Sequence, residues 1–518
     1  MGHCSLTLRW LGEPLLDAGL AACLIHAQKE VPQDLTWDDW EGWLRKVEED
    51  YAAGLWDRVL SVAFTQNGFT NPSLKGAARR AKVAEVFALA RGQAPSPTEN
   101  PEPLPPSGTA CVFYPEQVAV VLAARDRVPM LTGRAVMNFT PDGRGYLPLS
   151  AQALGCFLGA IYTAPLISGR LLVLTTADGS SPLDLFQVMH HDYVLPFLSL
   201  ARAGGRMEIK QPLSRIGEVL QKTAQNRKGA PRTFVAFWLS NSGQNPDVAI
   251  YRYVPGVEDF LREAHTARYR ADWQVFVRSF WVGKRQKKTV AFPPQAYAQE
   301  GTAPIQNSNG VELPIPPEQS RNLFYEVLPR LPQEAPQVIR YFFKGYAFRR
   351  LKGLVQRAGV SKEEIFLTHQ EPTYRPIGAI LDLFVKYFVL HMTEKQIELI
   401  RGLAREIAQL VLSELEPKAV KEILGIGRTN VARYSEWRLL LKRLLYRGLE
   451  QEGKLLFSLD DYLSLFEKVE GYPEADWMLS RDLLQIALLE ELYKEGYFSK
   501  NVSLLKSLAE EASEEETA

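Results

Sequence analysis

Two proline-rich stretches divide the chain, and they limit its fold more than any other feature of the sequence. Between Gly92 and Gly108, six of seventeen residues are proline. A second break runs from Pro293 to Gln319 around the turn-rich stretch QNSNG. Proline fixes φ and lacks a backbone donor, so neither stretch can continue a helix or a central strand. We therefore interpret 92–108 as a linker or loop and 293–319 as a loop between folded segments.

The apolar spacing between these breaks predicts an α+β fold, with a mixed α/β N-terminal domain followed by an all-α C-terminal helical bundle. Residues 1–91 read as an α+β segment, with helices over Asp17–Gln28 and Trp37–Leu60. Residues 109–292 read as a second α+β region. Strands are predicted at Leu6–Trp10, Arg170–Thr176, Arg206–Lys210, Thr233–Leu239 and Val248–Val254.

The C-terminal part carries the clearest helical pattern. After a helical connector at 320–391, apolar residues recur at three and four steps, as in Ile400, Leu403, Ile407 and Leu410. Ser458 and Asp461 have the spacing of a capping box. We therefore expect residues 392–518 to form a helical bundle.

Composition indicates a soluble, cytoplasmic protein. The four cysteines (Cys4, Cys23, Cys111, Cys156) are widely separated, which favours a reducing compartment. The N-terminus lacks the pattern of a signal peptide, and no apolar run reaches the ~18 residues of a membrane span.

The charges are balanced overall but unevenly distributed. The chain has 60 Lys plus Arg and 60 Asp plus Glu, whereas Arg202–Lys288 has 17 Lys plus Arg against 7 Asp plus Glu, interleaved with aromatic residues. Cations bind phosphate, and exposed aromatic rings can stack on unpaired bases. This pattern favours nucleic acid over the alternative, a solvated sheet face with core aromatics. The candidate phosphate-binding residues are Lys75, Arg79, Arg80, Arg278, Lys284, Arg285, Lys287, Lys288, Arg428, Arg433, Arg438, Lys442, Arg443 and Arg447.

Two loops rich in asparagine are candidates for reading bases. They are TQNGFTNPSLKGAARR (Thr65–Arg80) and SNSGQNPD (Ser240–Asp247). Asn and Gln side chains donate and accept at once, which suits bidentate contact with a base edge. Asn and Gly also dominate ordinary tight turns, so a purely structural role stays open for each loop. The candidate base readers are Asn67, Asn71, Asn241, Gln244 and Asn245.

The sequence contains no recognisable catalytic set. A phosphate loop and the His-Glu-x-x-His zinc motif are both missing. His190 and Asp192 suggest a metal-dependent nuclease as one alternative, but with seven histidines in the chain a structural role for them is favoured. We expect no catalytic residue and no cofactor.

An ordered set of motifs resembles a known family. The set runs through WLGEPLLDAG, NGFTNPS, VPMLTGRAVMNFTPDG, LPLSAQAL, GRLLVL and FWLSNSGQNPD. In that order, these motifs resemble the large subunit of type I-B CRISPR interference complexes (Cascade), in the branch named for a paired Cys-x-x-Cys motif. The resemblance covers roughly residues 4–255 by motif and the remainder by architecture only.

This resemblance implies a non-enzymatic protein in antiviral defence. Its partners would be crRNA, target double-stranded DNA with its displaced strand, the Cascade backbone and 5′-end-binding subunits, a small subunit, and a recruited nuclease-helicase. It would recognise the protospacer-adjacent motif, help to unwind the duplex and stabilise the R-loop. The Asn-rich loops would read the motif, and the basic clusters would follow phosphates. An alternative is the same targeting role in a CRISPR-associated transposon, with recruitment of transposition proteins. No membrane partner is implied.

Two further expectations depend on the resemblance. Only Cys111 remains of the paired cysteine motif, with Leu149 and Gln152 where thiolates would be expected, so four sulfur ligands cannot assemble and we expect no structural zinc. In relatives, an internal start yields a separate small subunit. Met392 precedes the bundle and would start a product of 127 residues, although a chance methionine at a helix start is the alternative.

Overall fold

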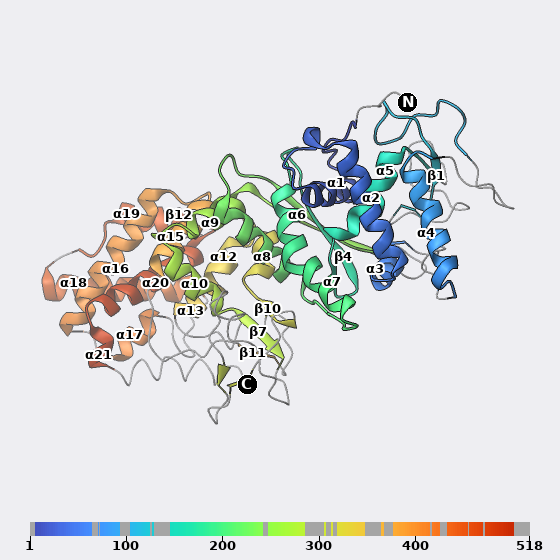
Figure 1. The fold of residues 1–518 in the computed structure, drawn as a ribbon. Coiled ribbons are helices and arrows are strands. Elements are labelled where there is room, and N and C mark those ends of the chain that lie inside the picture. The colour runs from blue at the N-terminus through green and yellow to red at the C-terminus, as the bar shows by residue number, and fades with distance from the viewer. Residues whose placement is uncertain are drawn as a thin grey trace. The chain divides into compact units, whose positions relative to one another are not determined.

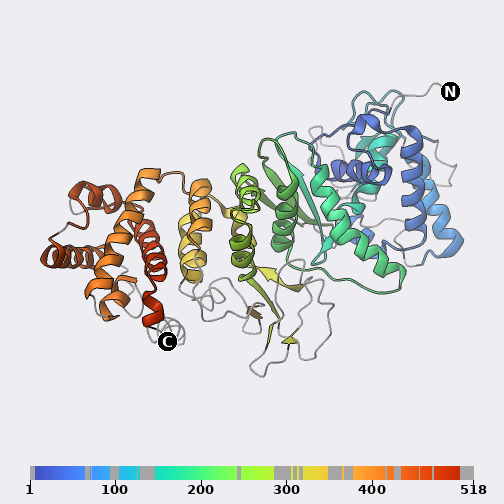
Figure 2. The same cartoon turned by 60° about the vertical axis from the view of Figure 1, so that its left-hand side comes forward.

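The chain is mixed helix and strand and forms two compact units, Met1–Glu258 and Asp259–Ala518, whose boundary falls inside helix α9 (Pro255–Ala264). In Figures 1 and 2 the orange and red C-terminal part of the ribbon is helical, whereas the larger sheet lies in the cyan and green part. Both proline-rich breaks lie largely outside the described residues. The computed structural model describes residues 6–64, 71, 73–93, 104–124, 127–128, 146–241, 247–284, 305–306, 312–313, 319–347, 364–366, 377–414, 417–424, 433–453, 455–469 and 472–501.

The first unit combines a helical layer with a four-stranded antiparallel sheet in the order β3-β4-β5-β6. Helices α1, α3 and α6 pack on β4. Its helices are α1 (Pro14–Ala27), α2 (Trp37–Ala52), α3 (Asp57–Ala63), α4 (Gly76–Ala90), α5 (Ala151–Gly159), α6 (Leu183–Met189), the π-helix η4 (His190–Val194), α7 (Leu195–Arg202) and α8 (Pro212–Asn226), with short 3-10 turns η1 (Pro32–Asp34) and η3 (Ala160–Tyr162). Its strands are β1 (Val121–Ala123), β2 (Leu147–Leu149), β3 (Leu166–Ile167), β4 (Arg170–Thr176), β5 (Phe234–Ser240) and β6 (Asp247–Tyr253).

Three of the five predicted strands are confirmed, as β4, β5 and β6, and β5 pairs antiparallel with β6 across the second Asn-rich loop. The strand predicted at Leu6–Trp10 is wrong. That segment is irregular, because the backbone amide of Thr7 donates to the Gln152 side chain and Arg9 pairs with Glu116 instead of joining a sheet. The strand predicted at Arg206–Lys210 is also wrong. The segment forms one isolated bridge, between Ile209 and Ile167. The helix predicted over Trp37–Leu60 is divided into α2 and α3 by a turn that includes Gly54 at a positive φ.

The helical layer depends on an unusually close crossing of α1 and α5. A Cβ atom added at Gly19 of α1 would lie 1.8 Å from the carbonyl oxygen of Cys156 in α5. On α5, Gly155 and Gly159 leave similar room for the indole rings of Trp40 and Trp43 of α2. These three partner residues, Cys156, Trp40 and Trp43, are all buried. Glycine at these positions therefore allows α1, α5 and α2 to pack into one core.

We expect Gly19→Ala to destabilise the protein strongly, by about 3 kcal/mol or more, because the methyl group meets backbone and not a movable side chain. Gly42→Ala in α2 is the matched control, since a Cβ there meets nothing within 4 Å. That change should be neutral or stabilising by about 0.5–1 kcal/mol, because alanine is the better helix former. Urea denaturation of the full chain measures both, and equal midpoints for the two variants would contradict the crossing.

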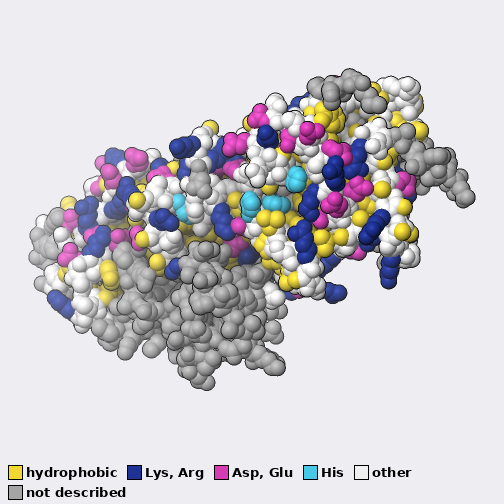
Figure 3. All heavy atoms as spheres, viewed as in Figure 1, with side chains coloured by type: hydrophobic (Ala, Val, Ile, Leu, Met, Phe, Trp, Pro, Cys, Tyr) yellow, Lys and Arg dark blue, Asp and Glu magenta, His cyan; other side chains and the backbone are white. Residues whose placement is uncertain are grey.

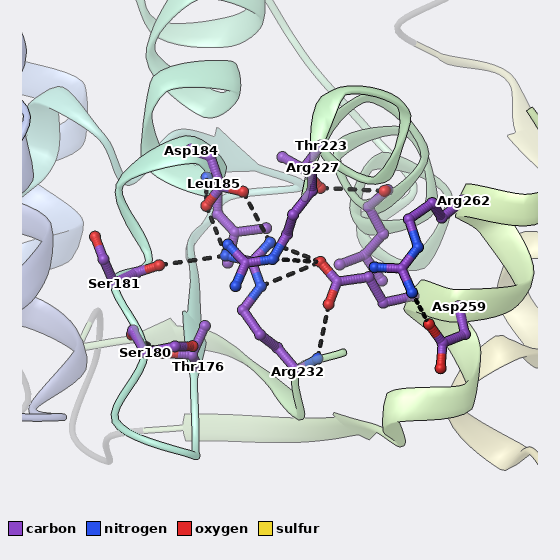
Figure 4. Close-up of polar contacts among 12 residues, drawn as sticks. Thr176, Ser180, Ser181, Asp184, Leu185, Thr223, Arg227, Arg232, Asp259 and Arg262 are labelled. Carbon is purple, nitrogen blue, oxygen red and sulfur yellow. Dashed lines mark hydrogen bonds and ion pairs between the residues drawn. The ribbon is translucent and has the colours of Figure 1, made fainter. Parts of the chain in front are cut away.

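A buried arginine ties the sheet to two helices. The guanidinium of Arg232 makes two 2.8 Å contacts with the carboxylate of Asp184 in α6 and one of 2.8 Å with Glu258 in α9. Its backbone amide also donates to Glu258, at 2.7 Å, and Arg227 lies 3.4 Å from the same carboxylate (Figure 4). Arg232 and Glu258 are almost fully buried, so each compensates the other's charge.

The second unit begins with an aromatic core and ends in the helical bundle. Phe276, Phe324, Phe343 and Phe384 contact one another in the core, with ring centroids 4.6 Å apart for Phe276 and Phe343. Its first elements are α10 (Arg270–Arg278), β7 (Trp281–Lys284), β8 (Ile305–Gln306), β9 (Glu312–Leu313), β10 (Arg321–Asn322), η6 (Tyr325–Arg330), α12 (Ala335–Val338), the π-helix η7 (Ile339–Lys344), α13 (Gly345–Ala347), β11 (Glu364–Phe366) and α15 (Gly378–Phe388). The bundle consists of α16 (Glu394–Glu414), α17 (Pro417–Leu424), α18 (Tyr434–Glu452), α19 (Leu459–Phe466), the short strands β12 (Glu467–Val469) and β13 (Tyr472–Pro473), α20 (Trp477–Lys494) and α21 (Tyr497–Lys500).

The bundle confirms the helical C-terminal region that the sequence predicts. The capping box of Ser458 and Asp461 is present at the start of α19. A buried carboxylate, Asp482 of α20, joins the bundle to η7 through Arg340 and Lys344, at 2.8 and 2.9 Å. Burial by itself raises the pKa of Asp482, but Lys344, Arg481 and Arg340 outweigh it, so the pKa is lowered. None of the described helices combines the length and hydropathy that a membrane span requires.

Candidate nucleic-acid interface

The two Asn-rich loops start at the same point of the first unit. The backbone amide of Asn241, directly after β5, donates to the carbonyl oxygen of Val62 in α3, at 3.1 Å. The first loop follows α3 within a few residues, and the second follows β5. Residues 65–70 and 242–246, and with them Asn67, Gln244 and Asn245, lie outside the described residues. The structure thus brings together the origins of two segments that are about 180 residues apart in the sequence.

Asn241 itself is buried at this junction. Only 4% of it is exposed, and its side-chain amide nitrogen has no hydrogen-bond partner among the described residues. A base edge does not reach a side chain at this depth. In this conformation Asn241 therefore positions the second loop and is not placed to contact a base.

Asn71 is exposed and organises the end of the first loop. Its side-chain oxygen accepts from the backbone amide of Ser73, at 3.0 Å, and from the Ser73 hydroxyl, at 2.8 Å. This is the Asx-turn chemistry that the sequence left open. The oxygen of Asn71 is thus engaged in a turn, which directs the chain toward Lys75 and the start of α4.

The cations after this turn differ in their surroundings. Arg79 is only 9% exposed, donates to the Tyr51 carbonyl at 3.0 Å and pairs with Asp57. It joins α4 to α2 and α3 and is not free for a phosphate in this conformation. Lys75 and Arg80 are exposed on the same helix start. Of the three predicted phosphate contacts in this segment, Lys75 and Arg80 are thus the exposed ones.

An arginine that the sequence did not single out lies at the base of the second loop. Arg170 of β4 pairs with Asp247, at 2.5 Å, and its guanidinium lies 4.3 Å from the ring centre of Trp238. The Trp238 indole donates to the Ile167 carbonyl, at 2.9 Å. Arg170 reaches the loop only through the register of β4, β5 and β6, a long-range pairing for which the local sequence carries no signal.

The basic cluster at 278–288 is described only in part. Arg278, at the end of α10, is half-buried, and its Nε has no hydrogen-bond partner among the described residues. Burial lowers the pKa of Arg278. The side chain of Lys284, at the end of β7, and the residues Arg285, Lys287 and Lys288 lie outside the described part.

The cations of α18 fall on two sides of that helix. Arg438 lies 3.1 Å from the buried carboxylate of Glu467, and Lys442 lies one turn further along the same side. Arg443 pairs with Glu422 of α17, at 3.3 Å, and Arg447 follows it by one turn. Arg433 and these four residues are exposed, and Arg428 lies outside the described residues. On the face in Figure 3, Lys and Arg are interspersed with Asp and Glu and form no single basic field.

His190 and Asp192, the residues that suggested a metal-dependent nuclease, each contact a neighbouring protein group. The Nδ1 atom of His190 lies 2.6 Å from the Tyr162 carbonyl oxygen, and Asp192 pairs with Lys222 at 2.9 Å. Burial lowers the pKa of His190. Cys23, Cys111 and Cys156 are buried free thiols. No group of three or more His, Cys, Asp or Glu in the described part of the chain has the arrangement of a metal site.

Comparisons with known proteins do not place the chain in a family. Neither the models of known protein families, nor the curated proteins, nor the solved structures gave a match to this chain.

Arg79 and Arg80 offer a matched pair for testing these placements. We expect Arg79→Met to lower the free energy of unfolding by about 1–3 kcal/mol, because Asp57 and the Tyr51 carbonyl lose their donor. Arg80→Met should change stability by about 0.5 kcal/mol or less, as is usual at an exposed site. Urea denaturation measures this difference. Equal losses in the two variants would show that Arg79 is not the structural member of the pair.

Proposed function

We propose that this chain is the non-catalytic large subunit of a crRNA-guided type I-B CRISPR effector complex. In this role it recognises the protospacer-adjacent motif in target double-stranded DNA, helps to unwind the duplex and stabilises the R-loop. It then recruits a nuclease-helicase in antiviral defence. The observation that carries the proposal is the hydrogen bond between Asn241 and Val62, which gives both Asn-rich loops a common origin.

A common origin suits the reading of a few base pairs. Guide pairing carries the sequence specificity, so the protein reads only a short motif and the shape of the duplex. Such reading needs several amide side chains within one groove width, together with cations for the flanking phosphates. Asn71 is engaged in a turn and Asn241 is buried, so Asn67, Gln244 and Asn245 are the base-reading candidates that remain. The exposed Lys75 and Arg80 follow the first loop. Arg170 is added to the phosphate-binding set because it adjoins the second loop through Asp247.

Because Asn241 is buried, we assign it to positioning the second loop, and we assign base contact to Gln244 and Asn245. We expect replacement of Gln244 and Asn245 by Ala to reduce discrimination between target motifs, by about 1–3 kcal/mol for each lost bidentate contact. Asn241→Ala should weaken binding to all motifs alike, because it disturbs the base of the loop and not a base contact. Binding of the assembled complex to DNA with a randomised flanking motif separates the two effects. If both variants lost the same affinity for every motif, the second loop would not read bases.

In the bundle, Arg433, Arg443 and Arg447 share one side of α18 and are the proposed contacts to the displaced strand. Met392 stays a prediction as an internal start. Thr393 and Gln396 cap α16 directly after it, with the Thr393 amide 2.9 Å from the Gln396 side chain. A product from Met392 would contain α16 to α21 but would lack Arg340 and Lys344, which pair with Asp482 in the full chain.

Charge reversal on this side of α18 tests the phosphate contacts. We expect Arg443→Glu with Arg447→Glu to weaken target DNA binding irrespective of the motif and to reduce the salt dependence, by up to about one unit of log–log slope for each lost contact. Arg405→Glu with Lys468→Glu, two exposed cations elsewhere on the bundle, is the control. Titration of DNA binding between low and moderate salt measures the slope. An unchanged slope would place the displaced strand elsewhere.

A further inference from the structure

Helix α18 has a second apolar face that the described part of the bundle leaves exposed. Its buried face contains Trp437, Leu440, Leu441 and Leu444. On the opposite side, Leu439, Tyr446 and Leu449 are exposed, although all three are large and apolar. Together with Lys442, whose ammonium lies 5.7 Å from the ring centre of Tyr446, they recur at alternating steps of three and four residues. That spacing forms one straight stripe on a helix, here called the α18 seam.

A groove runs along one side of the α18 seam. It lies between α18 and the start of α19 and has a volume of about 750 Å³. Leu439, Leu455 and Leu459 line it, with Arg438 and Lys442. The five large apolar residues of seam and groove, Leu439, Tyr446, Leu449, Leu455 and Leu459, are between 40% and 71% exposed. So many exposed large apolar side chains in one place mark an interaction surface.

We propose that the α18 seam and its groove bind an acidic amphipathic helix of a protein partner. Leucine side chains on steps of three and four match the ridge of an incoming helix, as in helix-in-groove recognition. Their burial drives association, whereas leucine neither pairs with phosphate nor stacks well on a base. Lys442 within the seam and the cations that border it, Arg438 on the groove side and Arg443 and Arg447 on the other, complement glutamates that flank the partner's apolar stripe.

Charge selects this occupant over a second copy of the chain. The exposed side of α18 carries Arg433, Arg438, Lys442, Arg443 and Arg447, against the exposed acids Glu436 and Glu450. Two α18 seams would bring these cations together, and like charges at an interface are unfavourable. The proposal does not rest on the proposed function, because the exposed leucines carry it, although Arg443 and Arg447, which border the seam, are also the proposed contacts to the displaced strand.

The test uses the full chain and a designed probe, a helical peptide of about three heptads with Leu at positions a and d and Glu at e and g. A peptide of the same composition in scrambled order is the peptide control. The seam variant is Leu439→Ser with Leu449→Ser, and the matched protein control is Leu390→Ser with Leu412→Ser, which are also exposed leucines. Fluorescence anisotropy measures peptide binding, and circular dichroism checks that each variant stays folded.

We expect the probe to bind the wild type, with the scrambled peptide binding at least tenfold more weakly. The seam variant should lose at least tenfold in affinity and the control variant less than twofold. Single-stranded DNA binding should be the same in the seam variant and in the wild type.

Four results would overturn the proposal. One is equal binding of the ordered and scrambled peptides, or of the seam variant and the wild type. A second is loss of single-stranded DNA binding in the seam variant, which assigns the seam to nucleic acid. A third is a wild-type dimer that the seam variant dissociates, which assigns it to a second copy. The last is peptide binding only after deletion of residues 502–518, which assigns it to the chain's own C-terminal segment.

Discussion

The close contact between Gly19 of α1 and the backbone of Cys156 in α5 determines how the first unit is assembled. It allows α1 and α5 to cross at a distance that no larger residue permits, and Gly155 and Gly159 extend the contact to Trp40 and Trp43 of α2. Helix α1 also packs on β4, so the same crossing places the helical layer on the sheet. The end of α3 then meets the end of β5, where the amide of Asn241 binds the Val62 carbonyl. The proposed motif-reading site is in this way a consequence of core packing.

The elements that the sequence predicted well are those with a local signal. Strands β4, β5 and β6 have β-branched and aromatic runs, and the capping box at Ser458 defines the start of α19 from four residues. The strand predicted at Leu6–Trp10 failed because alternation alone does not supply a partner strand, and Gln152 and Glu116 bind the segment instead. Local patterning indicates what a segment can form, whereas its neighbours decide what it forms.

The candidate site could be predicted only in part, for the same reason. The amide-rich loops are visible in the sequence, but their common origin depends on a contact between residues 62 and 241. Arg79 and Arg80 look alike in the sequence, yet Asp57 and the Tyr51 carbonyl engage only the first. Arg170 reaches the second loop through strand register, and the exposed leucines of α18 resemble core positions until the helix is packed. The charges could not be placed from the sequence either. A net charge of zero does not show that the cations of α18 are exposed, or that Arg232 is buried and paired with Glu258.

The central claim is that the chain works as a subunit of a guide-RNA complex, and its composition after purification from its own host tests this most directly. With an affinity tag on the full chain, we predict that a uniform short crRNA and several copies of a backbone subunit co-purify with it. They should remain bound through gel filtration at moderate salt, because protein contacts hold the complex in addition to phosphate contacts. A chain that elutes free of RNA, or that carries RNA of random length and sequence, would contradict the claim and leave a general nucleic-acid-binding scaffold.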